Sequence, residues 1–472
     1  MRPTRVRAAA PRHVSARRRA GRPRFHEFTG TKLANFPLPL GHAERISSAL
    51  NSLAQERRKS TPEHLANKEI LHADLLRRSR ERWSSLHRKM VALQEELDWE
   101  VYRLYGLLTE EEAAELAADP KSVPGIELGE RAFEIVLARK MAAGEVETQW
   151  FARHGSMPTT KVPEHWPEEY RRVIEKRIET IEKLPQSIGL IERPEYKRRW
   201  ASESWEKQEK DALRNWLLDR SEDRGLWFSS DESGTDRPRM MTVGRLADRL
   251  QDDADFVSVA RLYAGEEVEL IDALEEILDA EHVPFIPALR YKDSGLRKRT
   301  QWEETWRLQR LEDKTGERLD IKVPPKYTSA DFVKNSYWRN RGKLDVPKER
   351  FISYPGASPD GDKTLLLGWA GWDHAEQAHA LVTLIEERTT RDGWELERLM
   401  PLLAGLDEVM PWVKQWYSEV DPETGLSPAV AYEGYLQQQV ERYPGLSRDE
   451  LAKWRPPKKG RGRGPGKKKA DE

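Results

Sequence analysis

Residues 86–108 read LHRKMVALQEELDWEVYRLYGLL and carry the longest periodic pattern in the chain. Apolar residues recur there every three or four positions, which draws one stripe along a helix. The stripe comprises Leu86, Met90, Leu93, Leu97, Val101, Leu104 and Leu108. Gly106 marks the end of the predicted helix or a kink close to it. We expect this helix to pair antiparallel with one at residues 43–58, and to pack within the chain rather than against a partner protein.

The composition of the 472 residues also favours helices. Charged residues make up 34% and hydrophobic residues 38%, which is polar for a globular protein. Yet 17 Trp, 13 Tyr and 10 Phe are too many for a disordered one. Charged helices with aromatic residues on their buried sides fit both facts. Because the chain is too long for a single core, we predict a mainly α, multi-domain protein with a few short strands and disordered basic termini.

Turn formers and charge runs divide the chain into six predicted segments. They are a disordered basic leader at 1–24, an ordered region with a long helical hairpin at 25–108, a charged helical domain at 109–228, a polar linker at 229–239, a Trp-rich helical domain with short strands at 240–452, and a disordered basic tail at 453–472. Thr61 and Thr109 are predicted helix N-caps. Residues 365–369 are predicted to form a short buried strand.

The chain contains no cysteine, which excludes disulfides, thiol nucleophiles and cysteine-ligated zinc. No apolar run is long enough to cross a bilayer, and no apolar stretch follows the Arg-rich start as a secretory signal requires. A mitochondrial transit peptide would share the Arg-rich character, although Pro3, Pro11 and Pro23 would interrupt its helix. We therefore expect a cytoplasmic protein with no membrane partner.

The net charge of −1 conceals a strong asymmetry. Residues 1–24 hold nine arginines and no acid, whereas residues 453–472 hold nine cations and two acids. The remainder of the chain therefore carries −17. A body this acidic would repel a duplex wrapped around it, because phosphate contacts supply most nonspecific affinity for DNA. Any DNA contact must come from local basic patches or from the tails.

Several catalytic signatures are missing from the sequence. It has neither nucleotide-binding glycine fingerprint, no Gly-x-Ser-x-Gly elbow and no His-Glu-x-x-His helix. An adenine methyltransferase would need a glycine-rich loop for its methyl donor and an Asn/Asp-Pro-Pro-Tyr/Phe tetrapeptide for the extruded base, and neither occurs. We therefore assign no catalytic, cofactor-binding or metal-binding residue to this chain.

The most enzyme-like cluster is WAGWDH at residues 369–374, followed by His379. Asp373 and the two histidines could serve as metal ligands or as an acid–base pair. However, His374 and His379 are five residues apart, which does not place them on one helix face. We favour a structural role, in which Asp373 caps a helix while Trp369 and Trp372 pack beneath it.

A second cluster, at residues 337–355, interleaves cations with aromatic residues. Arginine and lysine can clamp phosphates there while aromatic rings stack on bases. Asp345 and Glu349 could equally pair with the same cations in an ordered structural loop. The residues alone do not decide between these two interpretations.

Ordered blocks of the sequence resemble a known family of fused restriction–methylation enzymes. FTGTKL at 28–33 with FPLP at 36–39 resembles the last strand and exit of a target-recognition region, and LQEELDWEVYRLYGL at 93–107 resembles the helix that follows it. Three later blocks resemble the C-terminal region of the PglX adenine-specific DNA methyltransferases of type 2 BREX phage-defence systems. These blocks are YKDSGLRKR at 291–299, residues 339–355, and LGWAGWDH at 367–374.

The resemblance implies N6-adenine methylation of double-stranded DNA, S-adenosylmethionine as the donor of the complete enzyme, and discrimination of host from phage DNA. It implies that residues 25–108 include the end of a target-recognition region. The implied partners are the methyltransferase core, other phage-defence proteins and double-stranded DNA. The nucleic-acid-binding candidates are Lys32, Arg339, Arg341, Lys343 and Lys348.

This sequence departs from the family pattern, since no position matches the family's catalytic core. We therefore expect this chain to be a DNA-recognition and partner-docking part that does not catalyse methyl transfer alone. Either the chain is a separately encoded or truncated piece, or its start is misassigned. One alternative is a stand-alone interaction scaffold of a phage-defence complex, favoured by the acidic body and the tryptophans. The other is an unrelated enzyme, such as a metal-dependent nuclease built on Asp373 and His374.

Overall fold

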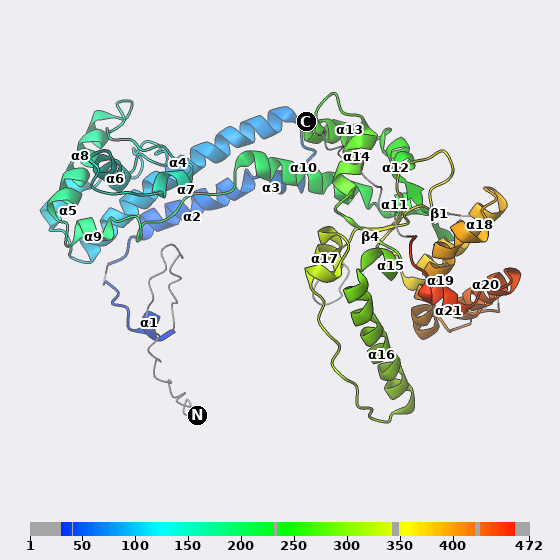
Figure 1. The fold of residues 1–472 in the computed structure, drawn as a ribbon. Coiled ribbons are helices and arrows are strands. Elements are labelled where there is room, and N and C mark those ends of the chain that lie inside the picture. The colour runs from blue at the N-terminus through cyan, green and yellow to red at the C-terminus, as the bar shows by residue number, and fades with distance from the viewer. Residues whose placement is uncertain (1–29, 40, 231–233, 342–348, 421–424, 458–472) are drawn as a thin grey trace, which may run out of the picture. The chain divides into compact units, whose positions relative to one another are not determined.

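The computed structural model describes residues 30–39, 41–230, 234–341, 349–420 and 425–457 (Figure 1). These residues form a mainly α protein with a few short strands, as predicted. The chain divides into two compact units, one of residues 1–52 and 88–200, the other of residues 53–87 and 201–472. Within the described part of the chain, no helix is long and apolar enough to span a membrane.

The first unit is built from helices. It holds α1 (Gly30–Ala34), α5 (Glu110–Leu116), α6 (Ala132–Ala142), α7 (Trp150–His154), α8 (Glu168–Lys183) and α9 (Ile188–Ile191), with parts of α2 (Glu44–Lys59) and α4 (Ala73–Leu104).

The second unit combines helices with short strands. Its helices are α3 (Pro62–Ala66), α10 (Trp205–Ser221), α11 (Arg224–Trp227), α12 (Val243–Leu250), α13 (Ala254–Ala264), α14 (Leu270–Leu278), α15 (Pro287–Arg290), α16 (Asp293–Thr315), the 3-10 helix η1 (Ser329–Asp331), α17 (Asn335–Arg341), α18 (His374–Thr390), α19 (Leu396–Trp416), α20 (Pro428–Arg442) and α21 (Arg448–Lys453). Its strands are β1 (Phe228–Ser230), β2 (Asp236–Pro238), β3 (Met241–Thr242), β4 (His282–Pro284), β5 (Phe351–Ser353) and β6 (Leu366–Trp369).

The helical stripe of residues 86–108 lies mostly on α4, which begins at Ala73 and runs beside α2 (Figure 1). An Arg82 guanidinium nitrogen lies 3.1 Å from a Glu56 carboxylate oxygen. A Cβ added to Gly41 would collide with the Leu104 side chain. These two contacts give the antiparallel pairing that the sequence predicts. Gly106, with φ of +66°, follows the end of α4.

The buried face of α4 is less apolar than the stripe suggests, because Glu95 and Glu96 lie inside the first unit. The Glu96 carboxylate accepts hydrogen bonds from Arg177 Nη1 at 2.9 Å and Nη2 at 2.7 Å. Arg177, on α8, is fully buried and also donates to the Leu116 carbonyl at the end of α5. Burial alone would lower the pKa of Arg177, but the Glu96 charge outweighs burial and raises the pKa.

A second buried cation, Lys197, contacts two further carboxylates of α4. Lys197 Nζ lies 2.9 Å from Glu192, 2.6 Å from Asp98 and 3.5 Å from Glu95. Three carboxylates therefore surround one ammonium group. Burial raises the pKa of Glu95 to about 7, although Lys197 opposes this shift. Burial therefore favours the protonated form of Glu95.

A third buried pair begins α6. Arg131 and Glu134 are both buried, and the guanidinium donates through Nε and Nη2 to the two carboxylate oxygens at 2.9 and 2.8 Å. Glu134 also accepts the Trp150 indole N–H at 2.9 Å. Burial would raise the pKa of Glu134, but the Arg131 charge outweighs burial and lowers it. This pair therefore links α6 to α7.

The described strands of the second unit form a four-stranded sheet in the order β3-β6-β5-β4, in which only β4 and β5 are parallel. Alternate residues of a strand point to opposite faces. Phe351 and Leu367 accordingly join the hydrophobic core of one face, whereas Ile352 and Leu366 join that of the other. Burial on both faces explains the continuous apolar run predicted as a short buried strand.

The core of one face gathers aromatic residues from distant segments. Trp227, at the end of α11, is fully buried between Phe351 and Trp372, with ring centroids 5.4 and 6.4 Å away. Its indole N–H donates to the Ser221 carbonyl at 2.8 Å. The core of the other face packs α18 against α19. The sheet is therefore the framework on which the helices of this unit pack.

The described residues of the segment predicted as a polar linker, 229–239, belong largely to two paired strands, because β1 and β2 run antiparallel with Phe228 opposite Pro238. Whether this segment also separates two domains stays a prediction, as do the other predicted boundaries. The predicted basic leader at 1–24 lies outside the described residues. Residues 458–472 of the predicted tail also lie outside the described residues, whereas Lys453 is the last residue of α21.

Both predicted N-caps are confirmed. Thr61 Oγ1 accepts the backbone N–H of His64 at the start of α3. Thr109 and Glu112 form a complete capping box at the start of α5. In each case a threonine accepts a backbone N–H that the first helical turn leaves without a partner.

Replacing Arg177 by methionine should strongly destabilise the first unit, because Glu96 would stay buried without its counter-charge. Breaking a buried pair in this way costs about 3–5 kcal/mol. Chemical unfolding followed by circular dichroism measures the loss. Arg172→Met is the control, since Arg172 is exposed on the same helix and its pairing with Glu168 is worth at most about 1 kcal/mol. Equal losses in the two variants would contradict this role of Arg177.

Candidate nucleic-acid interface and an aromatic pocket

The structure places the five predicted nucleic-acid-binding residues on different elements. Lys32 lies in α1 of the first unit, whereas Arg339 and Arg341 lie in α17 of the second. Lys343 and Lys348 lie outside the described residues. Only Arg339 and Arg341 are thus brought together, on the last turn of a short helix.

Helix α17 is held by its aromatic residues. Tyr337 is buried in a small core with Tyr291 and Phe332, and Trp338 packs on Phe332 with ring centroids 5.4 Å apart. Asn340 donates to the Ala280 carbonyl at 2.8 Å. These rings therefore anchor the helix, so the described aromatic residues of this segment do not offer free faces for base stacking.

The charged residues flanking these rings differ in their exposure and in their ion pairs. Arg339 is exposed. Arg350 instead pairs with Asp219 of α10 at 2.6 Å and with Glu222, which follows α10, at 2.5 Å. Asp345, one of the acids expected to pair with cations here, lies outside the described residues. The segment thus combines an internal ion-pair network with an exposed arginine, and the role of Arg339 in binding nucleic acid stays a prediction.

The WAGWDH motif begins α18, and the predicted helix cap is confirmed. Asp373 Oδ1 accepts the backbone N–H of Glu376 at 2.8 Å, and Glu376 Oε2 accepts that of Asp373 at 2.8 Å. Trp372 is buried beneath the helix start. Its ring lies so close to Gly368 that a Cβ there would collide with it. Glycine is therefore the residue that fits at position 368.

The two histidines of this helix have different surroundings. The His374 ring stacks on Trp412 of α19, with ring centroids 5.6 Å apart. His379 Nδ1 lies 3.3 Å from the hydroxyl of Tyr432 on α20. Among the residues that the structure describes, no three His, Asp or Glu side chains are grouped so that they could hold a metal ion.

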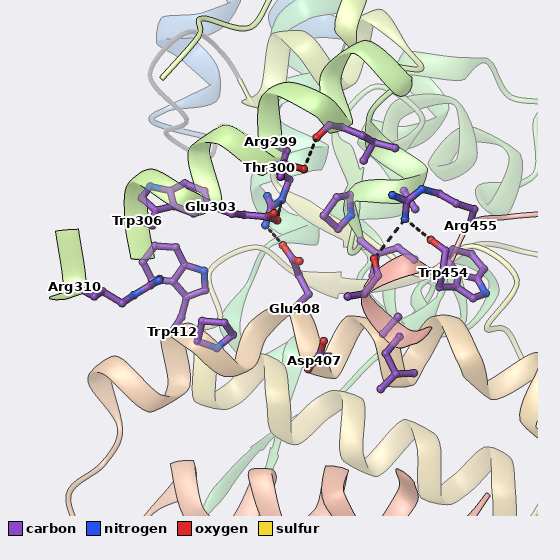
Figure 2. Close-up of a pocket in the computed structure, with 18 residues that line it drawn as sticks. Arg299, Thr300, Glu303, Trp306, Arg310, Asp407, Glu408, Trp412, Trp454 and Arg455 are labelled. Atoms are coloured by element: carbon purple, nitrogen blue, oxygen red, sulfur yellow. Dashed lines mark hydrogen bonds and ion pairs between the residues drawn. The ribbon is translucent and has the colours of Figure 1, made fainter. Parts of the chain in front are cut away.

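Trp412 also lines a pocket of about 390 Å³ in the second unit (Figure 2). Helix α16 contributes Arg299, Thr300, Glu303, Trp306 and Arg310, and helix α19 contributes Asp407, Glu408 and Trp412. Trp454 and Arg455, which follow α21, close another side. The Trp306 and Trp412 rings meet edge to face with centroids 5.4 Å apart. We call this site the aromatic pocket.

The aromatic pocket holds equal numbers of arginines and carboxylates, and its most central arginine is ion-paired. Arg299 donates to Glu408 and to Glu303, as the dashed lines of Figure 2 show. Burial would lower the pKa of Arg299, but the two carboxylates outweigh burial and raise it. Arg310 lies over the Trp412 ring, 4.7 Å from its centroid. Three arginines face three carboxylates among the described lining residues.

This balance limits what the aromatic pocket can do. A pocket with compensated charge and tryptophan walls favours an uncharged or aromatic group rather than a phosphate. The Thr300 hydroxyl donates to the Leu296 carbonyl at 3.3 Å. The arrangement therefore suits contact with a group of this kind. The sequence could not indicate it, because Trp306 and Trp412 lie on helices far apart in the chain.

Comparison with known proteins assigns the chain to a family. Residues 90–465 match the model of a family described as Domain of unknown function (DUF7008). The chain belongs to this DUF7008 family. It is 49% identical over 442 residues to the adenine-specific methyltransferase PglX of Streptomyces coelicolor, an alignment that covers 92% of this chain. The alignment spans 35% of the length of that relative. No solved structure matches the chain.

These matches confirm the resemblance seen in the sequence blocks. The chain is similar to one part of an adenine-specific methyltransferase, consistent with a C-terminal region. The blocks at residues 93–107, 291–299 and 367–374 all lie within the DUF7008 match. In the structure they supply part of α4, the start of α16 and the β6–α18 junction.

The role of Asp373 can be tested by two substitutions with different chemistry. Asp373→Asn keeps a side-chain oxygen that caps α18, whereas Asp373→Ala removes it at a cost of about 1 kcal/mol. We expect the Asp373→Asn variant to have a thermal unfolding midpoint near that of the wild type, and the Asp373→Ala variant to have a lower midpoint. If Asn destabilised the protein as much as Ala, the carboxylate charge rather than capping would be the important property.

Proposed function

We propose that this DUF7008 chain is the DNA-recognition and partner-docking part of an adenine-specific DNA methyltransferase of a BREX phage-defence system. Similarity to the methyltransferase PglX over nearly the whole chain supports this proposal. The sequence contains neither a donor-binding glycine loop nor the tetrapeptide that holds an extruded adenine. This chain therefore contributes contacts and positioning, and S-adenosylmethionine serves the complete enzyme in the cytoplasm.

The DNA-recognition part of the proposal is supported by the way in which α17 packs on the rest of the second unit. Buried aromatic residues fix one side of this helix, while Arg339 is exposed. A guanidinium on a fixed element can hold a phosphate at a defined position. We propose that Arg339 contacts the backbone of double-stranded DNA together with Lys32, Arg341, Lys343 and Lys348.

The partner-docking part is supported by the aromatic pocket. Tryptophans are enriched at the centres of interfaces, where surrounding contacts exclude water. Trp306 and Trp412 lie in such a setting. The chain spans only 35% of the related methyltransferase, so we propose that the partner is the methyltransferase region, which would insert an apolar side chain into this pocket.

A second candidate function, a stand-alone interaction scaffold of a phage-defence complex, rests on one specific observation. The chain between the basic ends carries a net charge of −17, which disfavours extended contact with DNA. Under this alternative the aromatic pocket would bind a defence protein, and DNA affinity would depend on the basic ends alone.

We expect Arg339→Ala to weaken binding to duplex DNA and to reduce the slope of log affinity against log salt by about 1, because one phosphate contact is lost. Fluorescence anisotropy of a labelled duplex over a series of salt concentrations measures both effects. Arg339→Lys is the matched control, since it keeps the charge and should keep most of the slope. An unchanged slope in the alanine variant would favour the scaffold.

A further inference from the structure

A second cavity of the second unit differs from the aromatic pocket in its charge. It encloses about 340 Å³ between the strands β2 and β3 and the helices α12 and α18. Its lining includes five arginines, and we call it the arginine cleft. These arginines are Arg237, Arg239, Arg245, Arg249 and Arg388. Glu387 is the only carboxylate among the described lining residues.

Local structure brings these arginines together. Arg237 and Arg239 flank Pro238, where the β1–β2 strand pair joins β3. Arg245 and Arg249 are four residues apart on α12, so they share one face of the helix. The opposite face, which includes Leu246 and other residues, is buried in the core. The strand pair and α12 thus direct four guanidinium groups to one cleft.

The charges of the cleft are poorly compensated. Arg388 is buried, but it is satisfied by Asp392 at 2.9 Å and by the Ala357 carbonyl at 3.0 Å. Arg245 and Arg249 are exposed. Asp362, outside the lining, interacts with Arg245, whose charge contributes to lowering the Asp362 pKa, whereas Arg249 makes no ion pair with the residues that the structure describes. Like charges four residues apart on a helix are destabilising. This cost persists unless an anion offsets it.

Arg239 gives a second, independent sign of a missing acceptor. Its Nη2 donates to the Leu226 carbonyl at 2.8 Å, but its Nε is buried and has no hydrogen-bond partner among the residues that the structure describes. A buried N–H without an acceptor is costly. Burial lowers the pKa of Arg239, and the neighbouring Arg249 charge lowers it further. Burial also lowers the pKa of His379, which lines the cleft, and Arg237 adds to this effect.

We propose that the arginine cleft binds a phosphate group, supplied by the sugar-phosphate backbone of duplex DNA. Guanidinium groups bind phosphate oxygens bidentately, and several arginines around one concave site can offset the charge of a phosphodiester. The described lining contains no Phe, Tyr or Trp on which a base would stack. The cleft therefore suits the phosphodiester backbone better than a stacked base.

The choice of DNA as the phosphate source rests on the proposed function, whereas the phosphate chemistry rests on the cleft alone. A volume of about 340 Å³ also suits a small phosphorylated ligand. The test must therefore separate these two sources. It must also separate the cleft from the contact proposed for Arg339.

The test uses the full chain with the double substitution Arg245→Ala and Arg249→Ala. Both side chains are exposed, so the fold should be kept. The control is Arg261→Ala, which removes an exposed arginine of α13 outside the cleft. We expect duplex affinity to fall about tenfold for each guanidinium removed, and the salt slope to fall by about 2. The control should match the wild type.

A second measurement follows the thermal unfolding midpoint in inorganic phosphate, compared with chloride at equal ionic strength. A ligand that binds the folded state raises the midpoint. We expect phosphate to raise it for the wild type and not for the double variant. If phosphate acted in this way while both proteins bound duplex equally, the cleft would serve a free phosphorylated ligand instead of DNA.

If the double variant matched the wild type in both measurements, the phosphate site would be overturned. In that case a loss of duplex affinity in Arg339→Ala would leave the proposed function intact. Conversely, if the wild type failed to bind duplex but was stabilised by phosphate through Arg245 and Arg249, the cleft would stand and the DNA-recognition proposal would fail.

Discussion

A guanidinium removed from water must meet an acceptor, and this constraint organises both units of the protein. Arg177 binds Glu96 and Arg131 binds Glu134 in the first unit. Arg299 binds Glu408 in the second. Each pair joins elements distant in sequence or fixes the start of a helix. Because one third of the residues are charged, the cores can close only where such pairs form.

Two cavities of the second unit differ in how fully this constraint is met. The arginines of the aromatic pocket contact carboxylates, a tryptophan ring or backbone carbonyls, and the pocket therefore suits an apolar group of a protein partner. The arginine cleft meets it less fully, because within the described part of the chain Arg239 keeps a buried N–H without an acceptor and Arg249 makes no ion pair. These two cavities separate the two proposed tasks, docking and DNA positioning.

The sequence predicted the features that depend on local spacing. The stripe on α4, the caps at Thr61, Thr109 and Asp373, and the strand at β6 follow from periodicity or from neighbouring residues. The burial of Glu95 and Glu96 could not be predicted, because their partners Lys197 and Arg177 come from distant segments. The arginine cleft was not predicted for a related reason, since the paired strands that position Arg239 were expected to be a linker.

The central claim is that this chain positions DNA and a partner without itself holding a methyl donor. Isothermal titration of S-adenosylmethionine into the purified chain tests it most directly, because donor binding needs no knowledge of the target sequence or of the partner. The account predicts no heat of binding at protein concentrations that suffice to detect the duplex. Saturable binding of one donor molecule per chain would contradict it.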